Sequence, residues 1–344
     1  MPTVDAARLE QLTRAIFVAR GVPIDDATWI ATTLVRANLR GHDSHGVIRI
    51  PQYVEGLARG TLNPTPRMTL VVDAPTLAIL DGDGGFGQVV ARRGVELARE
   101  RTRTHGLAAV ALRGANHVGR LADYAEFLAE AGLIGLLWAN ARGGLNVAPW
   151  GGAARRLGTN PHAIAVPGPG GSVALSHDFA SSVWAEAKLR VKYNRGESVP
   201  PGIMLNGRGE PSTDPREYYA DPVGSLLTAG AHKGFGLSIA VEILGGILSG
   251  SGAASGDPSV FRNGTLIVGL DPGRFLPLAD FHGQVAALLE WVRSAPLAAG
   301  AKEILVPGEP EARMERERRA AGVPIEDATW RQIQQCAEQV GVHA

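Results

Sequence analysis

Several classes of protein are disfavoured by what this sequence lacks. It has one cysteine, Cys336, which cannot form an intrachain disulfide. The 34 lysines and arginines balance 34 aspartates and glutamates, without a run of five basic residues, so nothing indicates nucleic acid as a partner. The longest apolar stretches, such as 132–138, are far shorter than the roughly 20 residues of a membrane helix. Acids and an arginine occupy the N-terminal segment where a signal peptide is apolar, so we expect a cytoplasmic protein with no membrane partner.

The chain is long enough for one large domain or two smaller ones, and both of its ends are predicted to be helical. It has 344 residues, whereas a single hydrophobic core stops growing at about 250 to 300 residues. The apolar spacing over 5–59 is typical of helices. Two segments, GVPIDDATW at 21–29 and GVPIEDATW at 322–330, each place a proline before an acid-rich first turn. We interpret this match as convergent helix capping rather than as an internal repeat.

Between the helical ends, predicted strands alternate with predicted helices. Apolar runs predict strands at 68–72, 76–80, 107–112, 134–138, 265–270 and 303–306. The spacing predicts helices at 88–104, 121–132, 233–248 and 281–295. This alternation predicts an α/β layer. The stretch 142–171 is rich in glycine, proline and asparagine, and such long loops are usually functional.

The glycine cluster 82–87, GDGGFG, matches a dinucleotide-binding fingerprint in form. It follows a predicted strand and precedes a predicted helix, as that fingerprint requires. The acid that should end the next strand of a Rossmann unit is missing, because Arg113 follows the strand 107–112. Asp81 and Asp83 would also repel a diphosphate. We therefore favour a tight structural turn.

The segment 40–49, RGHDSHGVIR, combines groups suited to proton transfer and carboxylate binding. Histidine exchanges protons near pH 7, and arginine holds a carboxylate through two parallel hydrogen bonds. A helix running through Val47 would set His45 and Arg49 on one face. That pairing suits a 2-oxo or 2-hydroxy acid, with Arg49 on the carboxylate and His45 on the neighbouring oxygen. The alternative is that His42 and Asp43 cap a helix and the histidines are surface groups.

A further histidine, His117, follows a predicted buried strand and precedes a predicted helix. Loops at the carboxyl ends of parallel strands are where α/β proteins place ligands. A metal site could collect His117 with His42, Asp43 and His45, but neither H-E-x-x-H nor Cys/His metal spacing is present, so no metal is expected. The sequence also has no G-x-S-x-G elbow, which disfavours a serine hydrolase.

A series of ordered stretches resembles the malate/L-lactate dehydrogenase-like family of NAD(P)-dependent oxidoreductases over essentially the whole chain. That family includes ureidoglycolate dehydrogenase, diketogulonate reductase, sulfolactate dehydrogenase and piperideine-2-carboxylate reductase, and it is unrelated to the Rossmann-type lactate dehydrogenases. The matching stretches are GHDSHGV at 41–47, DGDGGFGQ at 81–88, NHVG at 116–119, APWGG at 148–152, LGTNP at 157–161, DFASS at 178–182, PSTDP at 211–215, HKGFGL at 232–237 and VPGE at 306–309.

The resemblance implies a mixed-sheet α/β fold without a Rossmann unit, and a homodimer. It also implies a helical part built from both chain termini, which we place at 1–66 with 310–344. Residues 67–309 would then form a mixed α/β domain that binds cofactor and substrate.

The resemblance further implies a role for each matching residue. His45 would give a proton to the developing alkoxide or amine, beside Ser44, and His117 would be a second catalytic or orienting histidine. Arg49 would clamp the substrate carboxylate, and Tyr53 would contact the substrate. The residues implied for binding NAD or NADP are Thr159, Asn160, Asp178, Phe179, Ala180, Ser181, His232, Lys233, Gly234, Pro307, Gly308 and Glu309.

The chain departs from the family pattern in two places. Some members carry a lysine acting on substrate where this chain has NARGG at 140–144, which weighs against ureidoglycolate. His177 precedes Asp178 where an apolar residue is usual, and Phe179 replaces a methionine.

These observations lead to one hypothesis and two alternatives. We expect an NAD(P)-dependent oxidoreductase that transfers a hydride between nicotinamide and C2 of a small 2-oxo or 2-hydroxy acid, of malate, lactate or sulfolactate type, or of a cyclic 2-imino acid. The alternatives are a non-catalytic ligand-binding relative and a metal-dependent hydrolase.

Overall fold

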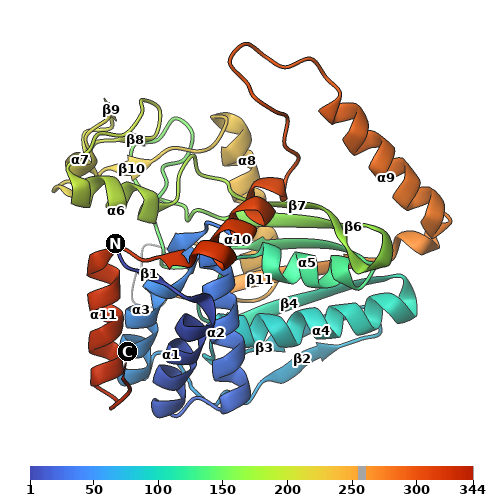
Figure 1. The fold of residues 1–344 in the computed structure, drawn as a ribbon, viewed down its shortest axis with the longest axis horizontal. Coiled ribbons are helices and arrows are strands. Elements are labelled where there is room, and N and C mark those ends of the chain that lie inside the picture. The colour runs from blue at the N-terminus through green and yellow to red at the C-terminus, as the bar shows by residue number, and fades with distance from the viewer. Residues whose placement is uncertain (255–260, 344) are drawn as a thin grey trace.

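A seven-stranded mixed sheet forms the centre of the molecule (Figure 1). The computed structural model describes residues 1–254 and 261–343. The strand order is β2 (Thr69–Asp73), β3 (Leu77–Asp81), β4 (Leu107–Ala115), β11 (Asn263–Leu270), β5 (Ile134–Ala139), β6 (Pro161–Pro167) and β7 (Val173–Ala180). Only β3 and β4 pair in parallel within this sheet. The expectation of a mixed-sheet α/β fold is therefore confirmed, and the sheet lacks the successive parallel strands of a Rossmann unit.

Helices α4 (Gly87–His105) and α5 (Ala122–Glu130) pack on the sheet, as do α8 (His232–Val241) and the π-helix Glu242–Ile247. Close approach of α4 depends on Gly94, because a Cβ there would lie 2.6 Å from a methyl carbon of Leu112 on β4. Gly106 ends α4 with φ +84°, the left-handed conformation that glycine adopts most readily. The sheet and these helices together carry the loops that form the site.

Both chain ends contribute to a second, helical part. It consists of α1 (Ala6–Ala19), α2 (Ile24–Leu39), α3 (Ile50–Ala58), α10 (Glu309–Ala321) and α11 (Asp327–Glu338). Strand β1 (Thr3–Val4) pairs with β12 (Val323–Pro324), which joins the two ends directly. Its core combines buried side chains from both ends, among them Leu9, Ile16, Phe17, Ile30, Leu34, Ile50, Val323 and Ile333. Phe86 and Val89 join the same core, so the domain boundaries at 66 and 310 stay a prediction.

A smaller unit and an extended helix complete the fold. Strands β8 (Met204–Leu205), β9 (Pro211–Ser212) and β10 (Ser225–Leu226) form a three-stranded sheet beside α6 (Glu186–Arg195) and α7 (Pro215–Tyr219). Helix α9 (Leu278–Arg293) stands away from the rest of the molecule (Figure 1). No helix within 1–254 and 261–343 is long and apolar enough to cross a membrane.

Two local predictions were wrong. The apolar run 303–306 forms no strand, because Val306 donates its backbone N–H to the Glu309 carboxylate at 2.9 Å instead of to a neighbouring strand. The expected helix 233–248 is α-helical only to Val241 and continues as the π-helix. The other predicted strands and helices are present, with shifted ends.

Candidate active site

His45 and Arg49 lie on two short turns rather than on one helix. The turns Asp43–His45 and Val47–Arg49 are single 3₁₀ turns, and Gly46 between them is extended at φ −90° and ψ −151°. The expected continuous helix is therefore wrong. The cause is Asn38, whose side chain accepts from the Val47 N–H at 2.8 Å and leaves no room for a Cβ on Gly46.

The two turns nevertheless bring His45 and Arg49 to the same small cavity of about 170 Å³. His117 and Ser44 line it as well, so the sequence-predicted catalytic residues meet there. Its further lining consists of Gln52, Val118, Gly119, Ala139, Ala141, Gly144, Asn146, Thr159, Pro161, Ala185, Glu186, Phe261 and Asn263. We call this the substrate cavity.

His117 is oriented by a buried hydrogen-bond chain. Its Nδ1 lies 2.7 Å from the Tyr53 hydroxyl, and Gln88 donates its Nε2–H to the same hydroxyl at 2.7 Å. Because the hydroxyl oxygen accepts from Gln88, its proton is free to donate to Nδ1 of His117, which leaves the imidazole proton on Nε2. Tyr53 thus lies behind His117 and is absent from the cavity lining among the described residues, contrary to its expected substrate contact.

His45 and His117 are both held in the neutral form. Their rings stack with centroids 5.4 Å apart, and Nδ1 of His45 lies 2.9 Å from the Ser44 hydroxyl. Burial, followed by the charge of Arg49, lowers the pKa of His45 to about 3. The same two causes hold the pKa of His117 well below its ordinary value. His45 can therefore accept a proton at neutral pH, whereas His117, whose Nδ1 faces the Tyr53 hydroxyl, presents an N–H donor.

Arg49 is fixed by protein contacts but keeps a free edge. Its Nε donates to the Ser44 carbonyl at 2.7 Å, and Nη1 donates to Oε1 of Gln52 at 2.9 Å. Among the described residues, no hydrogen-bond partner engages Nη2. A carboxylate in the cavity can take that donor.

A second cavity, of about 260 Å³, adjoins the first, and we call it the cofactor cavity. The two share Ser44, His45, Gly119, Thr159, Pro161 and Ala185. The predicted cofactor residues Asp178, Phe179 and Ala180 line it. Asp178 accepts the backbone N–H of Ala122 at 2.8 Å, where α5 begins, and burial raises the pKa of its carboxyl group.

Other predicted cofactor residues support this wall from behind. Ser181 donates its hydroxyl to the Thr159 carbonyl at 3.0 Å. The turn before α8 packs on the same segment, since a Cβ on Gly234 would lie 2.6 Å from the Ser181 carbonyl oxygen. His232 and Lys233, in the first turn of α8, are exposed beside this contact.

Two further sets of predicted cofactor residues form contacts within the protein instead of lining the cofactor cavity. Asn160 donates to Ser238 and to Oε1 of Glu242, the latter at 2.8 Å, and is fully buried. Pro307 accepts from the Ser176 backbone at 3.1 Å, which sets Gly308 beside β7 at φ +99°. The Glu309 carboxylate is engaged by the Val306 backbone and by Arg293.

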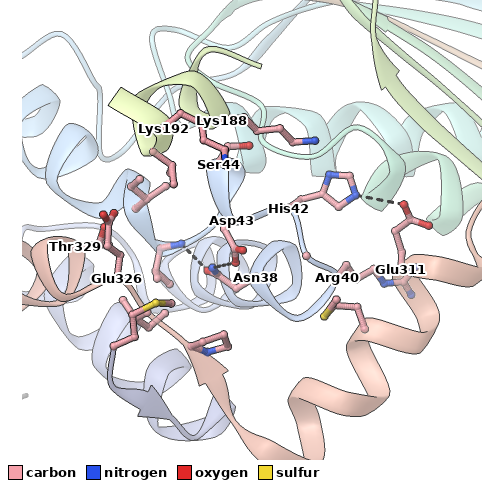
Figure 2. A pocket seen from close by; sticks show the side chains of 18 of the residues that line it. Asn38, Arg40, His42, Asp43, Ser44, Lys188, Lys192, Glu311, Glu326 and Thr329 are labelled. Atoms are coloured by element: carbon pink, nitrogen blue, oxygen red, sulfur yellow. Dashed lines mark hydrogen bonds and ion pairs between the residues drawn. The ribbon is translucent and has the colours of Figure 1, made fainter. Parts of the chain in front are cut away.

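The largest of the three cavities at this site, of about 630 Å³, opens next to the cofactor cavity (Figure 2). It lies between the segment 38–48, helix α6 and helix α10, and it shares His42, Ser44, Trp184 and Lys188 with the cofactor cavity. His42 pairs with Glu311 at 3.7 Å across one wall. The Lys188 side chain extends toward His42 in Figure 2, and within the described chain it forms no ion pair.

The glycine cluster 82–87 is a turn that supports the site. Asp81 pairs with Arg113 at 2.8 Å, and Asp83 accepts from Asn63 at 3.0 Å, so both acids have protein partners. A Cβ on Gly87 would lie 2.3 Å from the backbone carbonyl of His117. This packing against the His117 loop agrees with the prediction that the glycine cluster is a tight structural turn.

Sequence reasoning assigned no role to four residues at the site: Gln88, Arg120, Glu186 and Lys188. Gln88 ends one recognised stretch and Arg120 directly follows another, so their position was a signal that could have been used. The sequence contains no signal for Glu186 and Lys188, because charged residues are common at the start of a helix. In the part of the chain that the structure describes, no group of three His, Cys, Asp or Glu residues could hold a metal ion.

The chain is similar to known proteins over nearly its whole length. Residues 4–334 match the family described as malate/L-lactate dehydrogenase. The chain is 37% identical over 343 residues to hydroxycarboxylate dehydrogenase B of Escherichia coli, covering 98% of this chain and 94% of that protein. It is 37% identical over 339 residues to an L-lactate dehydrogenase of Cupriavidus necator, covering 96% of each. The solved sulfolactate dehydrogenase of Methanocaldococcus jannaschii superposes with a TM-score of 0.90 at 32% identity, covering 99% of this chain and 98% of that one.

Proposed function

Because this chain belongs to the malate/L-lactate dehydrogenase family, we propose that its two adjoining cavities form one active site for hydride transfer between a nicotinamide cofactor and C2 of a small 2-hydroxy or 2-oxo acid. The chain is an oxidoreductase, as its family is. The observation that carries the residue assignment is that His45 borders both cavities, whereas Arg49 lines only the smaller one.

Arg49 is the proposed carboxylate clamp. Its guanidinium is held in place by Ser44 and Gln52, and its remaining edge is available to the cavity. A planar guanidinium binds a carboxylate through parallel hydrogen bonds, which fixes C2 and its oxygen relative to the two histidines. A volume of about 170 Å³ suits a small acid.

The neutral imidazole of His45 is the proposed proton acceptor. A bound nicotinamide supplies the hydride acceptor. In the oxidative direction His45 takes the hydroxyl proton as the oxo acid forms, and in the reductive direction it returns a proton to that oxygen. His117, whose Nε2 carries a proton, orients the same oxygen by donating a hydrogen bond. This division of roles rests on the Tyr53 contact to Nδ1 of His117.

Substrate binding is expected to strengthen the base. Burial and the positive charge of Arg49 lower the pKa of His45. A carboxylate held by Arg49 offsets that charge, so the pKa of His45 rises in the substrate complex. The acceptor thus becomes more basic when a substrate is in place.

The cofactor cavity fits a nicotinamide nucleotide, either NAD or NADP. Thr159, Phe179 and Ala180 offer a partly apolar wall beside His45. Lys188 supplies positive charge for a diphosphate, and the larger cavity beyond it offers room for the adenosine part. The other predicted cofactor residues remain part of this proposal: Asn160, Asp178, Ser181, His232, Lys233, Gly234, Pro307, Gly308 and Glu309.

A homodimer is proposed on the character of α9. This helix stands off the molecule (Figure 1) and exposes large apolar side chains, with Trp291 76% exposed. Phe275 and Leu288 are exposed on the same segment. Exposed apolar patches of this kind mark interaction sites. Light scattering after size-exclusion chromatography tests the expected mass of two chains.

Steady-state kinetics test the proposed reaction. The protein is assayed with NAD⁺ and with NADP⁺ against lactate, malate and sulfolactate, and in reverse with the matching oxo acids and a cyclic imino acid, by the absorbance of the reduced nicotinamide. Replacing His45 by alanine is expected to lower kcat by about 10² to 10⁴-fold. Arg49→Ala is expected mainly to raise KM for the acid, whereas Arg59→Ala, an exposed arginine paired with Glu55, serves as control.

Two results would favour the alternatives. Binding of either nucleotide without turnover of any acid would favour a non-catalytic relative. Zinc in elemental analysis, together with metal-dependent hydrolysis, would favour a hydrolase. An unchanged kcat in the His45 variant would remove His45 from the mechanism.

A further inference from the structure

The substrate cavity contains a second charged group whose sign is opposite to that of Arg49. Among the described residues that line it, Arg49 is the cation and Glu186 is the anion, while His45 and His117 are held neutral. The remaining lining is uncharged. A cavity of about 170 Å³ therefore presents a positive and a negative group to one small molecule.

Glu186 is fixed with one oxygen free. As the first residue of α6 it lies at the positive end of the helix dipole, which favours its charged form. Its Oε1 accepts from Arg190 at 2.6 Å and from the Tyr219 hydroxyl at 2.7 Å. Oε2 takes part in none of the hydrogen bonds that the described residues make. Its side chain is 24% exposed.

Arg190 does not cancel the charge of Glu186 toward the cavity. Its side chain is 58% exposed and its guanidinium lies over the Tyr219 ring, 5.4 Å from the ring centroid. It is not part of the cavity lining, whereas Glu186 is. Water screens the outer charge of Arg190 more than the inner charge of Glu186.

We propose that Glu186 restricts the substrate to monocarboxylic 2-hydroxy and 2-oxo acids, with a far end that is neutral or donates a hydrogen bond, and rejects those that carry a second carboxylate or a sulfonate. This inference rests on the proposed function, because Arg49 must hold the first carboxylate. A second anion in the same small cavity would meet Glu186 instead of a cation, and like charges at such range repel strongly. A hydroxyl or ammonium group could donate to Oε2.

Family membership leaves this choice open. The names of the similar proteins include a lactate dehydrogenase, whose substrate has one anionic group, and a sulfolactate dehydrogenase, whose substrate has two. These substrates differ in the charge that they carry at the end remote from the first carboxylate. Glu186 is therefore a specificity-determining residue for the same reaction.

Kinetics with paired substrates test the inference. Values of kcat/KM are measured for lactate, glycerate, malate and sulfolactate in the wild type and in Glu186→Gln. The wild type is expected to favour lactate and glycerate over malate and sulfolactate by about tenfold or more, the ratio that an unfavourable charge contact of ordinary size gives. Glu186→Gln is expected to raise the ratio of kcat/KM for each dianion to that for lactate about tenfold.

Two controls keep the outcome interpretable. Glu197→Gln removes an exposed carboxylate that pairs with Lys192 just beyond α6, and it should leave every ratio unchanged. If Glu186→Gln does not fold, inhibition of the wild type decides: oxamate should inhibit at least about tenfold more tightly than tartronate, which carries a second carboxylate.

The failures are distinguishable. Equal use of malate and lactate by the wild type, or an unchanged ratio in Glu186→Gln, would overturn the role of Glu186 while leaving the dehydrogenase intact. Oxidation of no 2-hydroxy acid with either cofactor would overturn the proposed function itself.

Discussion

The Tyr53 hydroxyl, on a buried side chain, lies 2.7 Å from Nδ1 of His117, which is half-buried at the edge of the substrate cavity. Burial raises the pKa of Tyr53 to about 12, so this group remains a phenol that can donate to the imidazole. The contact connects α3 of the helical part to the loop after β4. It fixes which imidazole nitrogen carries the proton that faces the substrate cavity.

Tyr53→Phe should therefore impair the chemical step more than substrate binding. Without this hydrogen bond, neither the tautomer nor the ring orientation of His117 is fixed. We expect kcat to fall about tenfold, which corresponds to a rise of roughly 1.4 kcal/mol in the activation free energy, with little change in KM. The pH profile of kcat should change as well, because Nδ1 of His117 loses its donor. A variant with normal kcat and pH profile would show that Tyr53 acts only in packing. Phe17→Leu, next to Tyr53 in the same core, controls for packing alone.

The pH dependence should differ between free enzyme and substrate complex. Burial and Arg49 lower the pKa of His45 to about 3, so the free enzyme keeps a neutral base down to acidic pH. In the oxidative direction kcat/KM should therefore stay flat where an ordinary histidine, with a pKa near 6.5, would lose activity. Because a bound carboxylate offsets Arg49, kcat should fall at a higher pH than kcat/KM. A loss of kcat/KM near pH 6.5 would contradict this assignment.

Lys188 should contribute to cofactor binding through its charge. It borders both the cofactor cavity and the largest cavity (Figure 2). Lys188→Gln should raise KM for the nucleotide several-fold and weaken the dependence of that KM on salt, because a phosphate contact has been removed. Comparing NADH with NADPH shows whether the loss is greater for the extra phosphate. Lys302→Gln removes an exposed lysine that lines none of the three cavities, so it is the control and should change neither value.

Much of the fold could be predicted because the sheet and its helices have clear periodicity. The segments 107–112 and 134–139 are continuous apolar runs, and α4 follows a glycine turn. The nearly identical segments 21–29 and 322–330 show the limit of such reasoning. In the first, α2 begins at Ile24, whereas in the second Val323–Pro324 pairs with β1 and α11 begins only at Asp327. The second segment forms a strand because β1 is available to pair with it, and the local sequence does not contain that information.

The site was predictable in its chemistry more than in its geometry. His45, His117 and Arg49 were identified from residue type and spacing, and they do line one cavity. The helix proposed to align them does not exist, because Asn38 holds the backbone at Gly46 from a different element. Glu186 enters the cavity from the small three-stranded unit, so its role depends on packing between distant segments.

The two parts of the molecule are held together at Glu126, which gives a prediction for stability. This carboxylate is 1% exposed on α5 and accepts from Arg36 on α2 at 2.7 Å and from Arg40, directly after α2, at 3.0 Å. Arg120 at 2.9 Å and the Ser176 hydroxyl at 2.6 Å complete its contacts. A buried carboxylate is costly unless it is paired, and removing it leaves buried cations without a partner.

Glu126→Gln should lower the free energy of unfolding by about 3 kcal/mol. Glu130→Gln, at the end of the same helix, is the matched control: its side chain is 51% exposed and lies 3.8 Å from Arg36, so its loss should cost less than about 1 kcal/mol.

Burial opposes the charged form of Glu126, but Arg120 and Arg40 outweigh it and hold the pKa of Glu126 below its ordinary value of 4.5. A carboxyl whose pKa is lowered by folding stabilises the protein above its unfolded pKa and loses that contribution as the pH falls through its folded pKa. Urea unfolding across pH 3 to 7 should therefore show the wild type losing its advantage over Glu126→Gln below about pH 4.5, since that is where the unfolded chain begins to take up the proton. If the difference in free energy of unfolding between the wild type and Glu126→Gln does not change with pH, Glu126 stabilises the fold by packing and not by its charge.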